Sequence, residues 1–93
     1  DFLRPHDGDI VATIDVLGDL VRILPDAGEG ISIGLGPTGS ISLTGSLPHG
    51  LFVLERRPGR GVFDLVVRFG SQRRTFTGID EPSVVACLSA YVE

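Results

Sequence analysis

The sequence contains no Lys, Met, Trp or Asn, so all eight of its basic residues are Arg. This bias is typical of a GC-rich genome, and it indicates an actinobacteria-like bacterial source. Because an initiator Met is also missing, we expect the chain to have been trimmed and further segments to border it.

Cysteine is nearly absent too, because Cys87 is the only one in 93 residues. An internal disulfide is therefore excluded, and a secreted scaffold held by disulfides is not supported. The sequence also lacks a signal peptide and an apolar run of the roughly 18 residues that a membrane span needs. We expect one cytoplasmic domain over residues 1–93.

Charge of either sign is missing from the middle of the chain, although the net charge is only −4. Residues 1–30 carry seven acids and two arginines, residues 31–54 carry no charge, and residues 55–79 carry six arginines and two acids. This polarity favours a protein that is recognised through its surface.

Residues 9–24 are predicted to form a helix. Their apolar residues recur at helical spacing, which predicts one stripe facing the core. A hairpin is the alternative, but alternation of apolar and polar residues fails twice here. We expect Asp7 or Asp9 to cap the helix and Pro25 to end it by forcing Leu24 out of helical geometry. The predicted stripe is Ile10, Ile14, Leu17, Val21 and Leu24.

The stretch Gly34–Ser40 spells G-x-G-x-x-G, a pattern that also occurs in nucleotide-binding loops. Such a loop needs a helix to begin inside the motif, because the helix N-terminus holds the pyrophosphate. Here apolar and polar residues alternate on both arms, with Ile33 and Leu35 on the first arm and Ile41 on the second. We therefore predict a β-hairpin with these apolar side chains facing the core, and no nucleotide or other cofactor.

Three more strands and a second helix follow. Phe52 and Phe63 begin two alternating apolar patterns around a Pro-Gly turn, and Gly70 begins the next turn. Asp80 or Glu81 is expected to cap the last helix, with Pro82 in its first turn. The strands are predicted at about 30–36, 40–47, 51–57, 62–69 and 73–77, and the helix at 81–92.

This order predicts an α+β fold with an N-terminal helix, an antiparallel five-strand meander and a C-terminal helix. Both helices must bury an apolar stripe, so we expect two layers with the helices on one face of the sheet.

No catalytic, cofactor or metal site is assigned. Cys87, His6 and His49 could supply a Cys-His-Asp group, but no motif links them, and a Cys inside a helix stripe is usually a core residue. Their spacing does not match a metal site, and Asp7-Gly8-Asp9 resembles only the start of a calcium loop. No acid lies in an apolar context that would raise its pKa, so the sequence leans away from an enzyme.

Two surfaces are candidates for binding. Six arginines flank two turns. Nucleic-acid binding by these arginines is disfavoured, because we expect the aromatic side chains to be in the core and the net charge is negative. The arginines therefore form either a solvated strand face or a contact with an acidic protein partner. The uncharged hairpin lacks the charges that normally protect sheet edges. Either a glycine-rich twist or a covering segment hides it, or it meets another chain by strand addition at its edge or by a flat sheet contact, a homodimer being equally allowed.

The hairpin "FVLERRPGRGVFDLVVRFG" and the closing "IDEPSVVACLSAYV" resemble small bacterial immunity proteins, which are compact α+β partners that neutralise a toxin by covering it. The resemblance implies a non-enzymatic inhibitor whose acidic surface suits a basic toxin, or a secretion-associated partner. A small enzyme or ligand-binding domain that uses the open sheet face, and a dimerisation domain of a longer protein, are the alternatives. The expected partner-binding residues are Asp15, Asp19, Asp26, Glu29, Arg56, Arg57, Arg60, Ser32, Ser42 and Thr44.

Overall fold

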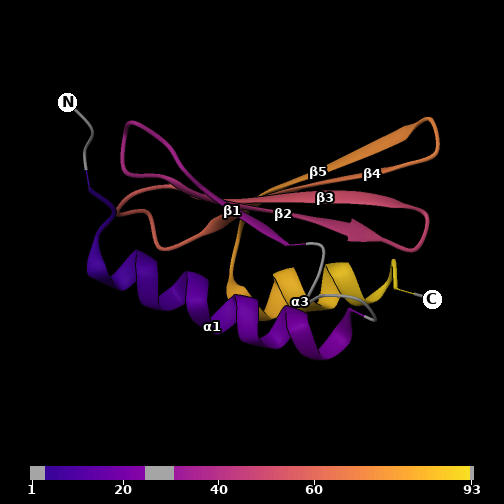
Figure 1. The fold of residues 1–93 in the computed structure, drawn as a ribbon, viewed down its shortest axis with the longest axis horizontal. Helices are drawn as coiled ribbons and strands as arrows, with labels where there is room; N and C mark the ends of the chain where they lie inside the picture. The colour runs from indigo at the N-terminus through magenta and orange to yellow at the C-terminus, as the bar shows by residue number, and fades with distance from the viewer. Residues whose placement is uncertain (1–3, 25–30, 93) are drawn as a thin grey trace.

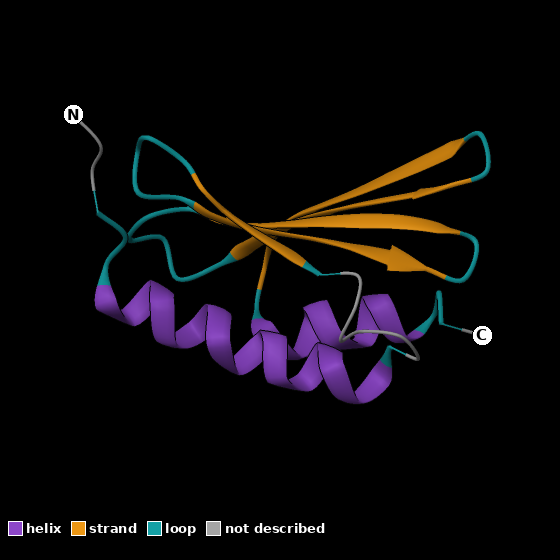
Figure 2. Cartoon of the chain, viewed as in Figure 1, coloured by secondary structure: helices purple, strands orange, loops and turns teal. Residues whose placement is uncertain are grey.

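Two helices lie side by side on one face of a five-stranded antiparallel sheet, and no described element covers the other face (Figures 1 and 2). This computed structural model describes residues 4–24 and 31–92. The strands pair in sequence order, so the predicted α+β meander is confirmed. The elements are α1 (Asp7–Ile23), β1 (Ser32–Leu35), β2 (Ile41–Leu47), β3 (Gly50–Arg56), β4 (Phe63–Phe69), β5 (Gln72–Ile79) and α3 (Glu81–Ser89).

The glycine motif forms the turn between β1 and β2, as predicted. The Gly36 N–H donates to the Ser40 carbonyl at 2.9 Å, and the Gly39 N–H donates to the Gly36 carbonyl at 3.2 Å. Gly39 has a φ of 85°, a left-handed conformation that favours glycine. A strand follows the motif, and Leu35 pairs with Ile41 across the turn.

The helix ends agree only partly with the expectation. Asp80 caps α3 by accepting a hydrogen bond from the Ser83 N–H at 3.0 Å, with Pro82 in the first turn, as predicted. Leu24 is extended, as the following proline requires. The capping prediction for α1 is wrong, because His6 occupies the cap position and makes no side-chain cap bond.

The boundaries of the elements differ most from the predicted ones at β1 and α3. β1 has only four residues, and α3 ends at Ser89 instead of residue 92. Tyr91 nevertheless packs against the sheet, because its ring lies 5.2 Å from that of Phe69, centroid to centroid.

The core lies between the sheet and the two helices. Alternate residues of β2, β3 and β4 point into it, and α1 and α3 close it from the other side. Its buried members are Val16, Leu20, Leu24, Leu43, Leu47, Phe52, Leu54, Phe63, Leu65, Val67, Val84 and Leu88.

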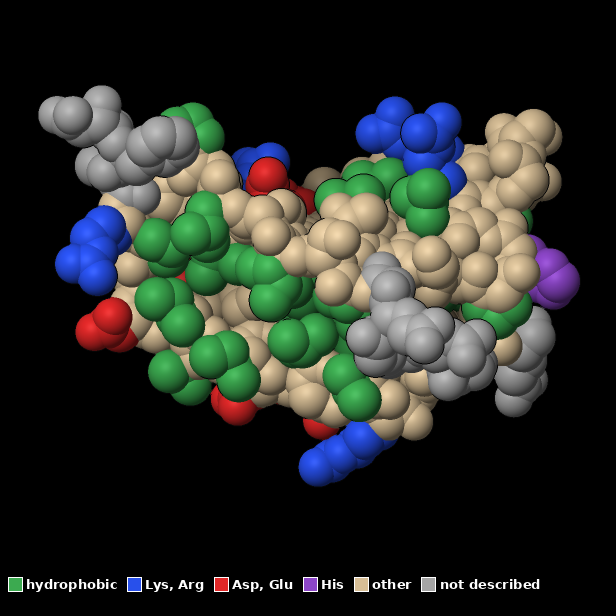
Figure 3. All heavy atoms as spheres, viewed as in Figure 1, with side chains coloured by type: hydrophobic (Ala, Val, Ile, Leu, Met, Phe, Trp, Pro, Cys, Tyr) green, Lys and Arg blue, Asp and Glu red, His purple; other side chains and the backbone are tan. Residues whose placement is uncertain are grey.

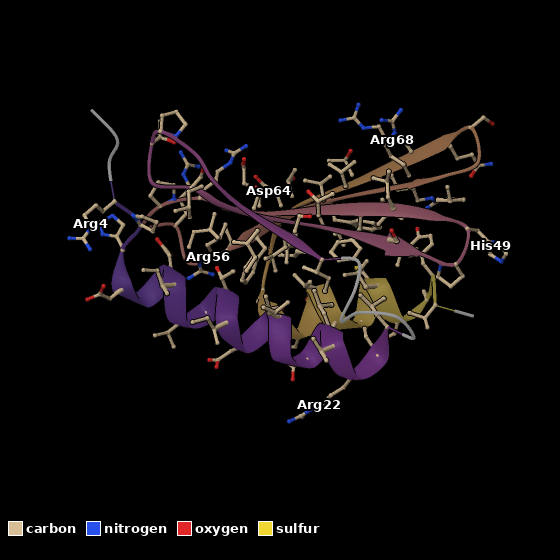
Figure 4. All side chains as sticks on the ribbon, in the orientation of Figure 1. Arg4, Arg22, His49, Arg56, Asp64 and Arg68 are labelled. Atoms are coloured by element: carbon tan, nitrogen blue, oxygen red, sulfur yellow. The ribbon has the colours of Figure 1, made fainter. Side chains whose placement is uncertain are left out.

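One ion pair joins the start of α1 to the end of β3. Arg56 is in phase with the inward residues of its strand, and it reaches toward α1 (Figure 4). Its Nε donates to Asp9 Oδ1 at 2.8 Å, while the Gly59 N–H donates to Asp9 Oδ2 at 3.0 Å. The guanidinium carbon also lies 4.8 Å from the centre of the Phe63 ring. The Asp9 and Arg56 side chains are only 5% and 11% exposed, so the pair is largely desolvated.

The ion pair lies on the buried face of α1, and this face is rotated about the helix axis from the face that the sequence predicted to be buried. The buried residues of the helix are Asp9, Thr13, Val16 and Leu20, each one position before a member of the predicted stripe. One residue corresponds to about 100° around a helix. The predicted buried stripe was therefore wrong at Ile10, Ile14 and Val21, which are exposed, whereas Leu24 is buried and Leu17 packs against the core as predicted.

Asp9 is therefore a buried partner of Arg56 and not the helix cap that the sequence suggested. Burial raises the pKa of Asp9, but the hydrogen bonds from Gly59 and Arg56, together with the Arg56 and His6 charges, lower it by more. The pKa therefore lies below its ordinary value, and Asp9 stays ionised as a structural partner of Arg56.

Removing one member of this pair should destabilise the fold, because it leaves the other charge buried without its partner. We expect Asp9→Leu to lower the free energy of unfolding by about 3 kcal/mol, and the double change Asp9→Leu with Arg56→Met to restore most of that loss. Urea unfolding of the parent, the two single variants and the double variant gives the coupling energy. A loss below about 1 kcal/mol for Asp9→Leu would show that the pair is not buried as described.

Candidate functional site

An open groove of about 1010 Å³ runs between α1 and the end of the sheet at β1. Figure 3 shows apolar side chains gathered on this side of the molecule. Eight of the eleven lining residues are Pro, Ile, Leu or Gly, so the groove is mainly apolar. They are Arg4, Pro5, Asp7, Ile10, Thr13, Ile14, Leu17, Ile33, Leu35, Gly36 and Ile41.

The helix contributes a second apolar stripe to this groove. Because α1 turns Asp9, Thr13, Val16 and Leu20 toward the core, the residues that follow each of them point about 100° away. Ile14 is 60% exposed, and the neighbouring Val11 and Val21 are also exposed. The apolar arc of α1 is thus wider than the face that the sheet covers.

The strand contributes the opposite wall. Ile33 pairs with Leu43 and Leu35 pairs with Ile41, so both side chains lie on the face of the sheet that carries the helices. They are nevertheless 61% and 65% exposed. The prediction that they are core residues was wrong, because α1 does not reach far enough to cover the first strand.

The backbone of β1 adds a free edge beside the groove. Among the described strands β1 pairs only with β2, so its outer N–H and C=O groups are open to another strand. The opposite edge, β5, carries Arg73 and Arg74, whereas no charged residue occurs from Ile31 to Leu54. Only one edge of the sheet therefore has the charges that discourage strand addition.

The polar residues of the groove do not form a catalytic set. Arg4 and Asp7 are exposed, and the Thr13 hydroxyl already donates to the Asp9 carbonyl at 2.7 Å. The described residues contain no group of three or more His, Cys, Asp or Glu side chains placed to hold a metal ion. The groove thus has the character of a docking surface for apolar side chains.

A second, smaller hollow of about 470 Å³ lies between α1 and α3, and its charged lining residues are two acids and one arginine, Arg22, so it is acidic on balance. Asp19 and Glu81 line it, and Asp15 lies one helical turn before Asp19. Burial raises the pKa of Glu81, and a hydrogen bond to Asp19 and the charges of Asp15 and Asp19 raise it further, against an opposing effect of Arg56. The expectation that no acid has a raised pKa was therefore wrong.

Two of the three arginines predicted to bind a partner form ion pairs within the fold. Arg56 is committed to Asp9, so it contributes little to the surface. Arg57 Nε lies 2.7 Å from Asp64 Oδ2, although the angle is not that of a hydrogen bond, and half of its side chain remains exposed. Arg60 is exposed in the loop between β3 and β4.

The other residues predicted to bind a partner lie on two surfaces, α1 and the open face of the sheet. Asp15 is exposed and Asp19 half-buried on α1, while Asp26 and Glu29 lie outside the described residues. Ser32 pairs with Thr44, and the Ser42 hydroxyl donates to the Gly34 carbonyl at 3.4 Å. Because they alternate with Ile33 and Leu43, these hairpin residues lie on the open face of the sheet, away from the groove.

The histidines and the cysteine are not joined. His6 begins α1, His49 is exposed in the turn between β2 and β3, and Cys87 is half-buried on α3. Within the described ranges none of the three side chains makes a hydrogen bond or an ion pair to another. In Figure 4 His49 lies at the opposite end of the molecule from Arg4.

Neither described helix combines the length and the apolarity that crossing a bilayer requires.

Comparisons with protein-family models, with curated proteins and with solved structures find no match to this chain.

The raised pKa of Glu81 predicts a pH dependence of stability. A carboxyl whose folded pKa exceeds its unfolded value of about 4.3 binds its proton more tightly in the folded state, so stability falls as pH rises through the window above that value. We expect Glu81→Gln to flatten this fall, and Asp19→Asn to reduce it because Asp19 contributes to the shift. Urea unfolding at a series of acidic to neutral pH values measures the slope. An unchanged slope in Glu81→Gln would contradict the assignment.

Proposed function

We propose that this chain is a non-enzymatic protein-binding module whose docking surface is the groove between α1 and β1. One observation supports this most directly: Ile10, Ile14, Ile33 and Leu35, from two different elements, converge on one groove while remaining exposed. Contiguous apolar surface of this kind marks interaction sites in soluble proteins, whereas single exposed apolar residues do not.

Two physical contributions would combine in such a contact. Burying the branched side chains contributes about 25 cal/mol for each Å² of apolar surface removed from water. Strand addition at β1 would add main-chain hydrogen bonds, and the alternating Ile33 and Leu35 side chains would provide specificity. The free edge and the apolar groove lie next to each other, so one partner could use both.

The residues that line the groove favour a binding surface over an enzyme active site. An enzyme site needs polar groups that converge on a reacting atom, and usually an acid or base with a shifted pKa. None of the three carboxyls with a shifted pKa, Asp9, Asp80 and Glu81, lines this groove. The groove also lies on the helix-covered side, and not on the open sheet face.

A toxin-neutralising role is a second form of this function, and the acidic hollow favours it. Burial raises the pKa of Glu81, and the hydrogen bond to Asp19 and the repulsion from Asp15 and Asp19 raise it further. A cationic partner would relieve that repulsion, so a basic toxin is the partner of matching chemistry. This hollow lies on the α3 side of α1, whereas the groove lies on the β1 side.

Site-specific photo-crosslinking tests the docking surface. A photoreactive amino acid at position 14 or 33 should form protein adducts in extract of the source cells, whereas one at position 51 should not. Leu51 is the matched control, because it is an exposed apolar residue on the open face of the sheet. Support requires the same partner at both groove positions and loss of its binding in purified form on Ile14→Glu. Equal adducts at all three positions, or none, would refute the docking surface.

The toxin-neutralising role is tested by measuring the affinity for the partner that crosslinking identifies. We expect the change Asp15→Asn with Asp19→Asn to weaken binding at least tenfold, and added salt to weaken binding of the parent chain. Glu55→Gln, on the open face of β3, is the control and should leave the affinity unchanged. Binding that is indifferent to salt and to both aspartates would exclude an electrostatic partner.

A further inference from the structure

We propose that the groove is occupied by a second copy of this chain, joined by antiparallel pairing of β1 with β1 of the other copy. This inference rests on the proposed function, because it names the partner of the same docking surface. It follows from the strand edge, from the apolar side chains beside it and from the charges around it.

The edge of β1 suits a copy of itself. Two antiparallel strands related by a two-fold axis present the same backbone groups to each other, so a single edge is self-complementary. β1 has no proline or charged residue to prevent this, and its turn places Pro37 beyond the strand. The arginines on β5 make the same pairing unfavourable at the other edge. The result would be one continuous sheet of ten strands.

The apolar side chains suit the same arrangement. In such a sheet Ile33 and Leu35 of both copies lie on the helix side, next to one another. The helices of the two copies then run antiparallel below them. Ile14 lies close to the middle of α1, so a two-fold axis near it sets the second apolar stripe of one helix against that of the other.

The charges also favour a second copy over a strongly charged partner. Only Arg4 and Asp7, which are exposed and of opposite sign, are charged among the residues that line the groove, whereas Asp19 and Arg22 lie on the other side of α1 and line the hollow beside α3. The segment Ile31–Leu54 has no charged side chain to pair with a highly charged foreign partner, and for the same reason two copies of it do not repel each other.

Sedimentation equilibrium of the purified chain tests this inference. We expect a reversible dimer whose dissociation constant rises at least tenfold in Ile14→Glu and in Ile33→Lys. Both positions are more than half exposed in the single chain, so the folded state should tolerate these changes. Leu51→Lys makes the same change from an apolar to a charged residue on the open sheet face, and it should leave the dimer intact. Circular dichroism and unfolding midpoints check that each variant is folded.

A charge-pairing experiment tests whether the two β1 strands meet. Ile33→Glu and Ile33→Lys should each be monomeric alone, because like charges would face each other across the axis. A mixture of the two should form a heterodimer. Failure of the folded variants to associate on mixing would overturn the β1 pairing.

The remaining outcomes separate this inference from the proposed function. A strictly monomeric parent chain at high concentration overturns the second copy, and a dimer that survives both groove variants places the contact elsewhere. If the monomer still captures one foreign protein through positions 14 and 33, the docking surface stands and its occupant is a different chain. If neither a dimer nor such an adduct forms, both proposals fail.

Discussion

The desolvated contact between Asp9 and Arg56 is the constraint on which the arrangement of this molecule depends. Arg56 stands at an inward position at the end of β3, where a core residue would otherwise continue the pattern of Phe52 and Leu54. A guanidinium at that place needs a carboxylate, and only the start of α1 supplies one in the described structure. The Gly59 N–H occupies the second carboxylate oxygen, so the helix, β3 and the following loop are tied at one point.

This contact has a consequence for the surface of α1. The helix turns Asp9 inward, and Thr13, Val16 and Leu20 follow on the same face. The remaining apolar residues then point beside the sheet and not onto it, where they meet the exposed Ile33 and Leu35 of β1. A structural ion pair at one end of the helix is thus coupled to the apolar groove along its side, which is the surface we propose for docking.

The two sides of α1 have different chemistry, and this separates the candidate functions. Toward β1 the surface is apolar and nearly neutral, which suits a self-complementary contact. Toward α3 the surface carries Asp19 and Glu81 beside Arg22, and Asp19 and Asp15 add to the rise that burial causes in the pKa of Glu81, which suits a cation-bearing partner. Because the two surfaces lie on opposite sides of one helix, association through the first would leave the second open.

Local signals in the sequence were sufficient for the element order. Alternation identified the hairpins around Gly34–Ser40 and the Pro-Gly turn, and Asp80 and Pro82 marked the start of α3. The order of these elements implied an antiparallel meander. These features depend on neighbours within a few residues, so they can be read without knowing the fold. The resemblance to immunity proteins and the cytoplasmic location remain predictions.

The orientation of α1 and the exposure of β1 were decided only by the tertiary structure. The helix carries apolar residues around more than half of its circumference, and its periodicity favoured a wholly apolar stripe 100° from the buried one, which contains Asp9 and Thr13. The phase of Arg56 with Phe52 was the signal that could have distinguished them, but its meaning depends on a carboxylate 47 residues away. The exposure of Ile33 and Leu35 depends on how far the helix layer extends across the sheet. Sequence periodicity determined which faces are apolar; long-range pairing of charges and the limited width of two helices decided which of those faces is buried.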